Sequence, residues 1–92
     1  MPELTHADIL IEGEVQGVFF RAFTVRIAKS LNLRGYVRNI AHGSVEVVAE
    51  GYKDKLEELI NKLHSGPPES LVENVDVKWS DYTGQFGNFE IK

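Results

Sequence analysis

Residues 7–31 read ADILIEGEVQGVFFRAFTVRIAKSL, and the spacing of the apolar residues changes midway through this stretch. The segment from Ala7 to Glu12 is a short apolar run bounded by Gly13, which is typical of a central β-strand. From residue 20 onward, apolar residues recur at intervals of three and four and basic residues occupy the opposite side, which predicts an amphipathic helix ending near residues 32–35. The apolar positions of that helix are Phe20, Phe23, Ile27, Ala28 and Leu31. The stretch therefore predicts a strand, a loop and a helix in succession.

The next segment predicts a β-hairpin. Residues 36–40 have the composition of a strand, and Ala41-His42-Gly43 is typical of a turn whose glycine takes a positive φ. Apolar and acidic residues then alternate over residues 45–50, which predicts a returning strand with Glu46 and Glu50 on its solvated face.

A second helix and a fourth strand follow the hairpin. Leucines and isoleucine recur at helical spacing over residues 56–63, and prolines at 67 and 68 end the helix because proline cannot donate to its continuation. Alternation over residues 75–80 predicts the fourth strand, and residues 89–91 form a possible short fifth strand. The resulting order (βαββαβ) is the split βαβ pattern of the α+β ferredoxin-like fold, an antiparallel four-stranded sheet with two helices on one face.

The composition excludes several classes of protein. Of 92 residues, 42% are hydrophobic and 26% charged, as in ordinary globular domains, and none is cysteine. Thiol nucleophiles, thiolate metal sites, iron–sulfur clusters and disulfides are therefore excluded. No apolar run approaches the ~20 residues of a membrane span, and Met1-Pro2-Glu3 lacks the basic start and apolar core of a secretory signal. We expect a soluble cytoplasmic protein without membrane association.

Charge is segregated along the chain. The net charge is −4, but residues 15–45 contain five bases, including all four arginines, and no carboxylate. The charges either cluster by chance on a short chain or create a local positive field for a small anion. The overall acidity argues against a broad nucleic-acid footprint.

The segment GEVQGVFFR, residues 13–21, joins the predicted first strand to the predicted first helix. At such a junction, unpaired N–H groups and the positive end of the helix dipole point outward. Gly13 and Gly17 let the backbone curl so that successive N–H groups converge on one anion, and Arg21 could add two parallel hydrogen bonds. A Gly-x3-Gly segment is also a common turn, so a phosphate cradle and an ordinary turn remain alternatives.

Other catalytic motifs are absent from the sequence. It has no Gly-x-Ser-x-Gly elbow, no Gly-x4-Gly-Lys-Ser/Thr loop and no Asp-x-Asp pair. His6, His42 and His64 lack the spacing of a helical zinc pair, so we interpret them as surface or packing residues and expect no metal ion. The spacing around Arg21 is similar to the Cys-x5-Arg cradle of cysteine-dependent phosphatases, but Val15 stands in place of the nucleophile. A phosphate held here would therefore be attacked by water.

Two sets of residues match the signatures of a known family. The first set is Gly13, Val15, Gln16, Gly17, Val18, Phe20 and Arg21, and the second is Gly35, Tyr36, Val37, Arg38, Asn39, Gly43, Val45 and Gly51. On these motifs the sequence resembles the acylphosphatases over essentially its whole length. The resemblance implies a single acylphosphatase-like domain over residues 1–92.

The resemblance also implies an activity and a set of site residues. The activity is metal-independent hydrolysis of the carboxyl–phosphate bond of acyl phosphates by direct attack of water, with no cofactor. Arg21 looks like the phosphate-binding arginine and Asn39 like the residue that positions the water. The phosphate cradle corresponds to the backbone N–H groups of Val15, Gln16, Gly17, Val18, Phe19 and Phe20. We expect a monomer whose ligands are an acyl phosphate and inorganic phosphate, and we expect Glu14 to face solvent because an inward carboxylate would repel them.

Two other hypotheses remain. The domain could be a binding module that keeps the cradle without useful turnover, since an acylphosphatase-like domain also occurs at the N-terminus of a larger hydrogenase-maturation protein. It could also bind RNA, because Arg34-Gly35-Tyr36 begins like the aromatic RNA-binding motif, although residues 37–39 depart from it.

Overall fold

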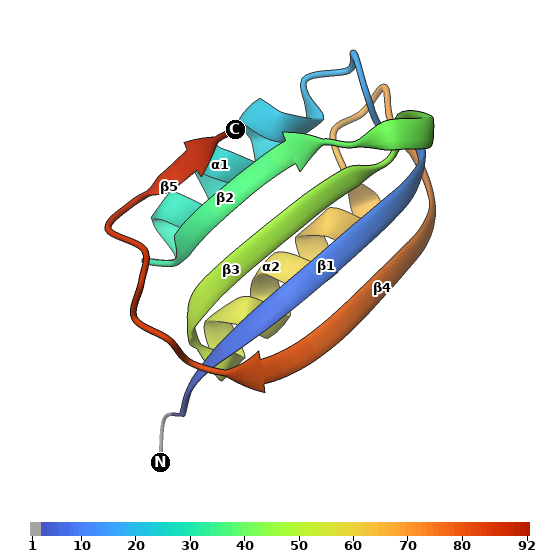
Figure 1. Cartoon of the computed structure of the whole chain (residues 1–92). Coiled ribbons are helices and arrows are strands. Elements are labelled where there is room, and N and C mark those ends of the chain that lie inside the picture. The colour runs from blue at the N-terminus through green and yellow to red at the C-terminus, as the bar shows by residue number, and fades with distance from the viewer. Residues whose placement is uncertain (1–2) are drawn as a thin grey trace.

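The computed structural model describes residues 3–92 (Figure 1). Residues 1–2, part of the segment on which the expectation of no secretory signal rests, lie outside the described residues. None of the described helices combines the length and apolarity needed to cross a membrane. The elements are β1 (Leu4–Glu14), α1 (Phe20–Ser30), β2 (Arg34–Asn39), a 3-10 turn (Ala41–Gly43), β3 (Val45–Tyr52), α2 (Lys53–Ser65), β4 (Leu71–Asp81) and β5 (Phe89–Ile91).

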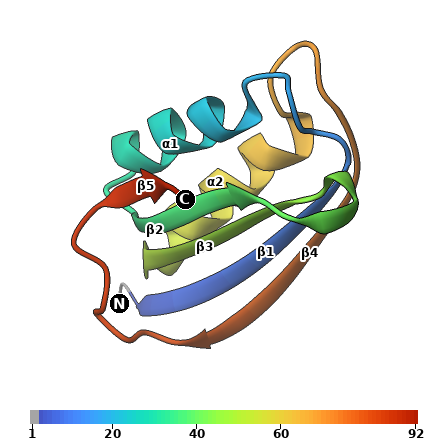
Figure 2. The same cartoon turned by 45° about the horizontal axis from the view of Figure 1, so that its top comes forward.

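The sheet confirms the predicted ferredoxin-like topology. Its strand order is β4-β1-β3-β2-β5, and neighbours among the first four strands are antiparallel. The short strand β5 adds to the edge next to β2 in parallel, so the complete sheet is mixed. Both helices cover the same face of this sheet (Figure 2). We call the opposite side the open face.

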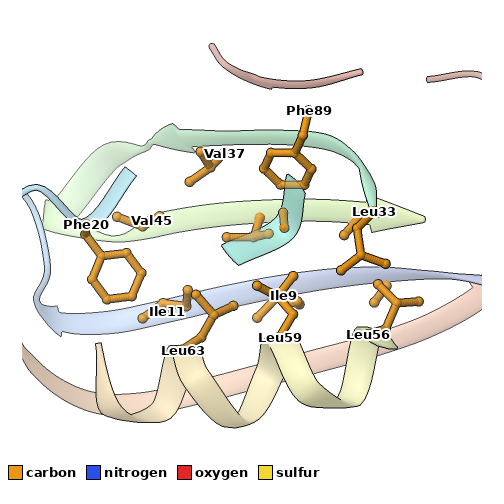
Figure 3. Close-up of a cluster of buried hydrophobic side chains, with 14 of the residues drawn as sticks. Ile9, Ile11, Phe20, Leu33, Val37, Val45, Leu56, Leu59, Leu63 and Phe89 are labelled. Atoms are coloured by element: carbon orange, nitrogen blue, oxygen red, sulfur yellow. The ribbon is translucent and has the colours of Figure 1, made fainter. Parts of the chain in front are cut away.

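Alternation along the central strands builds the core on the helix-covered face. Ile9 and Ile11 of β1 are buried there, as are the inward residues of β3 and the leucines of α2 (Figure 3). The first helix buries a polar residue as well, because the Thr24 hydroxyl donates to the Phe20 carbonyl oxygen at 2.9 Å and is thereby satisfied. The apolar spacing predicted the start of α1, but the helix ends at Ser30 and not near residues 32–35, and the spacing gave no indication that Thr24 is fully buried.

A β-bulge lies where β1 approaches its end. The pairing of β1 with β4 shifts between Glu12 and Gly13, so that Glu12 pairs with Asn74 and Gly13 with Val72. Glu73 of β4 therefore has no pairing partner on β1, and the apolar side chains along β4 no longer occupy every second position. For this reason the sequence pattern placed the start of this strand at residue 75, whereas β4 begins at Leu71.

A C-terminal strap, residues 82–88, connects β4 at one edge of the sheet to β5 at the other (Figures 1 and 2). Glu50, on the open face of β3, fixes this strap. Its carboxylate accepts hydrogen bonds from the Thr83 N–H at 2.9 Å, the Thr83 hydroxyl at 2.7 Å and the Gly84 N–H at 3.0 Å. His6 Nδ1 lies 2.6 Å from the same carboxylate. The prediction that Glu50 is solvated is therefore wrong, because the strap covers it and leaves it only 3% exposed.

The environment of Glu50 also sets its acidity. Burial alone would raise the pKa of this carboxyl, but the hydrogen bonds from His6, Thr83 and Gly84 favour the charged form and lower the pKa below its ordinary value of 4.5. The charged form of Glu50 is thus part of the stable fold, and it joins β1, β3 and the strap.

We predict that Gly13→Ala destabilises the fold by about 3–5 kcal/mol, because a Cβ there would collide with the Leu71 carbonyl oxygen and approach Glu73 N to 2.9 Å. Gly43→Ala is the matched control, since Gly43 also has a positive φ but a Cβ there meets no atom within 4 Å. It should lose only about 1 kcal/mol. Urea unfolding of both variants measures the difference, and equal losses would contradict the proposed collision.

We further predict that Glu50 makes stability depend on acid pH. Because its pKa is lower in the folded state, its contribution is complete above the unfolded value near 4.5 and is lost as the pH falls through the folded pKa. Glu50→Gln should lose about 1–3 kcal/mol at pH 7 and show a flatter decline of unfolding free energy below pH 4.5. The exposed α2 variant Glu57→Gln is the control. An unchanged pH profile in Glu50→Gln would refute the assignment.

Candidate active site

A hollow of about 360 Å³ lies where the β1–α1 loop, the first turn of α1, the end of β2 and the end of β5 meet. It is lined by Val15, Gly17, Phe19, Phe20, Arg21, Ala22, Asn39 and Ile91. The fold thus brings Arg21 and Asn39, which belong to different signatures, to one place. Of the predicted site residues, Gln16 and Val18 do not line the hollow.

The β1–α1 loop curls between two buried side chains. Val15 and Phe20 are each 1% exposed and anchor the ends of the loop in the core. Between them, Gly17 has φ 74° and Phe19 has φ 63°, both in the left-handed region. This region is readily available to glycine but strained for phenylalanine. Left-handed residues in such a curl turn successive N–H groups toward one concave side, which is the geometry of an anion nest.

The Gln16 side chain holds this loop against the turn that follows β2. Its Nε2 donates to the Ile40 carbonyl oxygen at 2.9 Å and to the Ser44 carbonyl oxygen at 2.8 Å. Gln16 was predicted only as a contributor of a backbone N–H group, whereas the structure shows that its side chain holds the loop. Nothing in the local sequence identifies these partners, which only the hairpin geometry provides.

The N–H groups of the loop have no internal acceptors. Within residues 3–92, those of Gln16, Gly17, Val18 and Phe19 donate no hydrogen bond, and the first loop-to-helix bond runs from Phe23 N to Phe19 O at 3.0 Å. The helix that follows has no side-chain cap and no acidic residue in its first turn. The positive end of the α1 dipole therefore faces the hollow without a neutralising group of its own.

Arg21 is the only charged residue among those lining the hollow. It is exposed on the first turn of α1, and no carboxylate within the described chain forms an ion pair with it. Arg38 differs, because its Nε lies 2.6 Å from Glu46 Oε1 on the open face. This contact and hydrogen bond raise the pKa of Arg38. Of the two arginines in the matched signatures, Arg21 is thus the one free to bind an anion in the hollow.

Asn39 ends β2 on the same face as the helices. Gly35 and Val37 are buried on that face, and alternation places Asn39 there as well. Its Oδ1 is buried and is the one such side-chain atom within residues 3–92 that lacks a hydrogen-bond partner. An unsatisfied buried acceptor costs about 1–3 kcal/mol, so its presence in a hollow indicates a site for a hydrogen-bonding ligand.

The surrounding acids and histidines stay outside the hollow. Glu14 is exposed and does not line it, as expected from the repulsion argument. His42 and His64 are also exposed, whereas His6 is buried against Glu50. Within residues 3–92, no group of three or more histidine, cysteine, aspartate or glutamate side chains is arranged to hold a metal ion.

The sequence pattern did not indicate two residues of the hollow. Ala22 follows Arg21 on α1, and Ile91 comes from the opposite end of the chain. Ile91 was expected only as part of an edge strand. Its place in the hollow depends on the strap and on the parallel pairing of β5 with β2.

Comparison with known proteins is consistent with this geometry. The family model described as Acylphosphatase matches residues 7–91. An acylphosphatase of Anaeromyxobacter sp. (strain Fw109-5) is 48% identical over 92 residues, covering 100% of this chain and 99% of the relative. The crystal structure of acylphosphatase from Bacillus subtilis has a TM-score of 0.92 at 33% identity and covers 98% of this chain and 99% of its own.

A structure of full-length HypF in a phosphate- and nucleotide-bound form is also similar. Its TM-score is 0.89 at 31% identity, and the match covers 100% of this chain but only 12% of that protein. Relatives that match over their full length bear the acylphosphatase name, and the family model spans nearly the whole chain. The chain therefore belongs to the acylphosphatase family.

Proposed function

We propose that the hollow hydrolyses acyl phosphates by direct attack of water on phosphorus, without a metal ion. The observation that carries this proposal is that hydrogen-bond donors without acceptors and a hydrogen-bond acceptor without a donor lie in the same hollow. Loop N–H groups and Arg21 are donors without acceptors, and Asn39 Oδ1 is an acceptor without a donor. A phosphoryl group satisfies the donors, and a water molecule satisfies the acceptor.

In this mechanism, the hydrogen-bond donors and the helix dipole stabilise the negative charge of the phosphoryl group. The transferred phosphoryl group carries its negative charge on three equatorial oxygens, so catalysis requires orientation and charge stabilisation. The loop N–H groups, the uncapped end of α1 and the Arg21 guanidinium all present positive charge to the same small volume. Because these groups are fixed by the fold before substrate binds, they need little reorganisation during the reaction.

Asn39 has a geometric role in this mechanism. Its Oδ1 accepts a hydrogen bond from the attacking water and thereby directs a lone pair of that water toward phosphorus. An amide is too weak a base to remove the proton. A bond forms between the water oxygen and phosphorus as the acyl oxygen–phosphorus bond breaks, and the carboxylate leaves with the bonding electron pair. A carboxylate is a weakly basic leaving group and needs no general acid, and the water proton passes to phosphate and solvent.

We predict that Arg21→Gln and Asn39→Ala each lower kcat for benzoyl phosphate by about 10²–10³-fold, the usual effect of losing one preorganised transition-state contact. Arg26→Gln is the matched control for the first, since Arg26 is an exposed arginine on the same helix. Asn61→Ala on the exposed side of α2 is the control for the second. Circular dichroism should show an intact fold in all four variants, and a chelator should leave the wild-type rate unchanged.

Each part of the proposal can fail separately. Full activity of Arg21→Gln or Asn39→Ala would contradict the assignment of that residue. Loss of wild-type activity on treatment with a chelator would contradict metal independence.

Gln16→Ala is predicted to act through the shape of the loop. Loss of the two hydrogen bonds to the carbonyls of Ile40 and Ser44 should lower the unfolding free energy by about 1–2 kcal/mol and weaken inhibition by inorganic phosphate severalfold. Gln85→Ala, an exposed change in the strap, is the control. Unchanged phosphate inhibition in Gln16→Ala would show that this tether does not shape the cradle.

The similarity to a small part of HypF favours a second candidate function, a binding module within the same fold. The two functions are separated by turnover of the isolated chain. Tight binding of phosphate with negligible hydrolysis of acyl phosphates would favour the module, whereas turnover that Arg21→Gln lowers by about 10²–10³-fold supports the enzyme.

A further inference from the structure

The hollow has a second, non-polar part. Phe19 is 81% exposed and Ile91 is 49% exposed, so two large apolar side chains remain in solvent at a site whose other features bind a phosphate. Ala22 adds a third apolar contact on the lining. Phe19 belongs to no part of the buried core, and its backbone is in the strained left-handed region. The packing of the fold therefore gives no reason for a phenylalanine at this position.

Charge restricts what this non-polar part can bind. Apart from Arg21, no residue lining the hollow is charged. Lys92, which neighbours Ile91, directs its ammonium group instead to the Tyr36 ring, 4.7 Å from its centroid. A second anionic group on a substrate would therefore find no cation among the lining residues once Arg21 binds the phosphate.

Ile91 is held in position by the sheet. β5 pairs in parallel with β2, with Val37 opposite Ile91. The Gly35 N–H donates to the Asn88 carbonyl oxygen at 2.9 Å, and the Lys92 N–H donates to the Val37 carbonyl oxygen at 2.9 Å, on either side of the short strand. Phe89, 1% exposed, inserts into the core and anchors β5 (Figure 3). Ile91 is thus a preorganised wall of the hollow and does not need to be ordered by the substrate.

We infer that Phe19 and Ile91 form a subsite for the acyl group and that the chain prefers acyl phosphates with bulky, uncharged, non-polar acyl groups, such as aromatic ones, over acetyl phosphate. This inference rests on the proposed function. When the phosphate occupies the loop and Arg21, the acyl group extends toward the uncharged remainder of the lining. There, burial of its apolar surface against Ile91 and Phe19 strengthens binding.

The test compares kcat/KM for benzoyl phosphate and acetyl phosphate in the wild type and in substituted chains. Threonine and valine have nearly the same shape, but threonine carries a polar hydroxyl. Ile91→Thr and Ile91→Val therefore form a matched pair that differs mainly in the polarity of the side chain. Phe19→Asn removes the ring while keeping a residue that tolerates the left-handed backbone. Leu71→Ala, an exposed apolar residue at the start of β4, is the distant control.

We expect the benzoyl-to-acetyl ratio of kcat/KM to fall by about three- to tenfold in Ile91→Thr and Phe19→Asn, and by less than about twofold in Ile91→Val and Leu71→Ala. Inhibition of Ile91→Thr by inorganic phosphate should stay within about twofold of wild type, since phosphate has no acyl group. The difference in intrinsic reactivity between the two substrates is the same for every chain, so it does not affect the comparison of a variant's ratio with the wild-type ratio.

An unchanged ratio in both Ile91→Thr and Phe19→Asn, with both chains folded, would overturn the acyl subsite but leave the proposed hydrolysis intact. Failure of the wild type to hydrolyse either substrate would overturn the proposed function and the subsite together. An equal loss of activity toward both substrates in both variants also leaves the ratio unchanged; it would assign Phe19 and Ile91 a purely structural role and would overturn the subsite.

Discussion

The central constraint in this molecule is that the backbone N–H groups of a short loop need hydrogen-bond acceptors that residues 3–92 do not provide. Val15 and Phe20 are buried and fix the two ends of the β1–α1 loop. Between them the backbone curls through two left-handed residues, and its N–H groups find no acceptor within the described chain. Buried or converging polar groups without partners are unfavourable unless a ligand or solvent satisfies them. In the proposed mechanism, the same curl provides a preorganised place for an oxyanion.

The rest of the fold serves to complete the site around that loop. Antiparallel pairing with β3 fixes the end of β2, which meets the first turn of α1 at the hollow, so that Asn39 and Arg21 both line it. The Gln16 side chain joins the loop to the β2–β3 turn. At the other end of the sheet, Glu50 secures the strap that leads to β5. Groups from four separate segments are therefore held in one arrangement by a single sheet.

Much of the architecture could be predicted from the sequence because the spacing of apolar residues indicates which side of a helix or strand is buried. The helices, the hairpin and the order of the elements along the chain followed from apolar intervals of two and of three to four. The two signatures also selected Arg21 and Asn39, which share the hollow. Contacts between residues far apart in the sequence could not be predicted in this way. A bulge opposite Gly13 disturbed the alternation in β4, and the strap buried Glu50 on a face that the pattern assigned to solvent. Ile91 enters the hollow only through strand pairing that no local pattern encodes.

The claim that the loop N–H groups and Arg21 bind a phosphoryl oxyanion is tested most directly by titrating isotopically labelled protein with inorganic phosphate and following backbone amide and arginine Nε–H resonances by NMR. The account predicts saturable shifts concentrated at residues 16–21, with the Arg21 Nε–H moving at the same phosphate concentration. Small, unsaturated shifts spread over the surface lysines, with residues 16–21 unmoved, would contradict it.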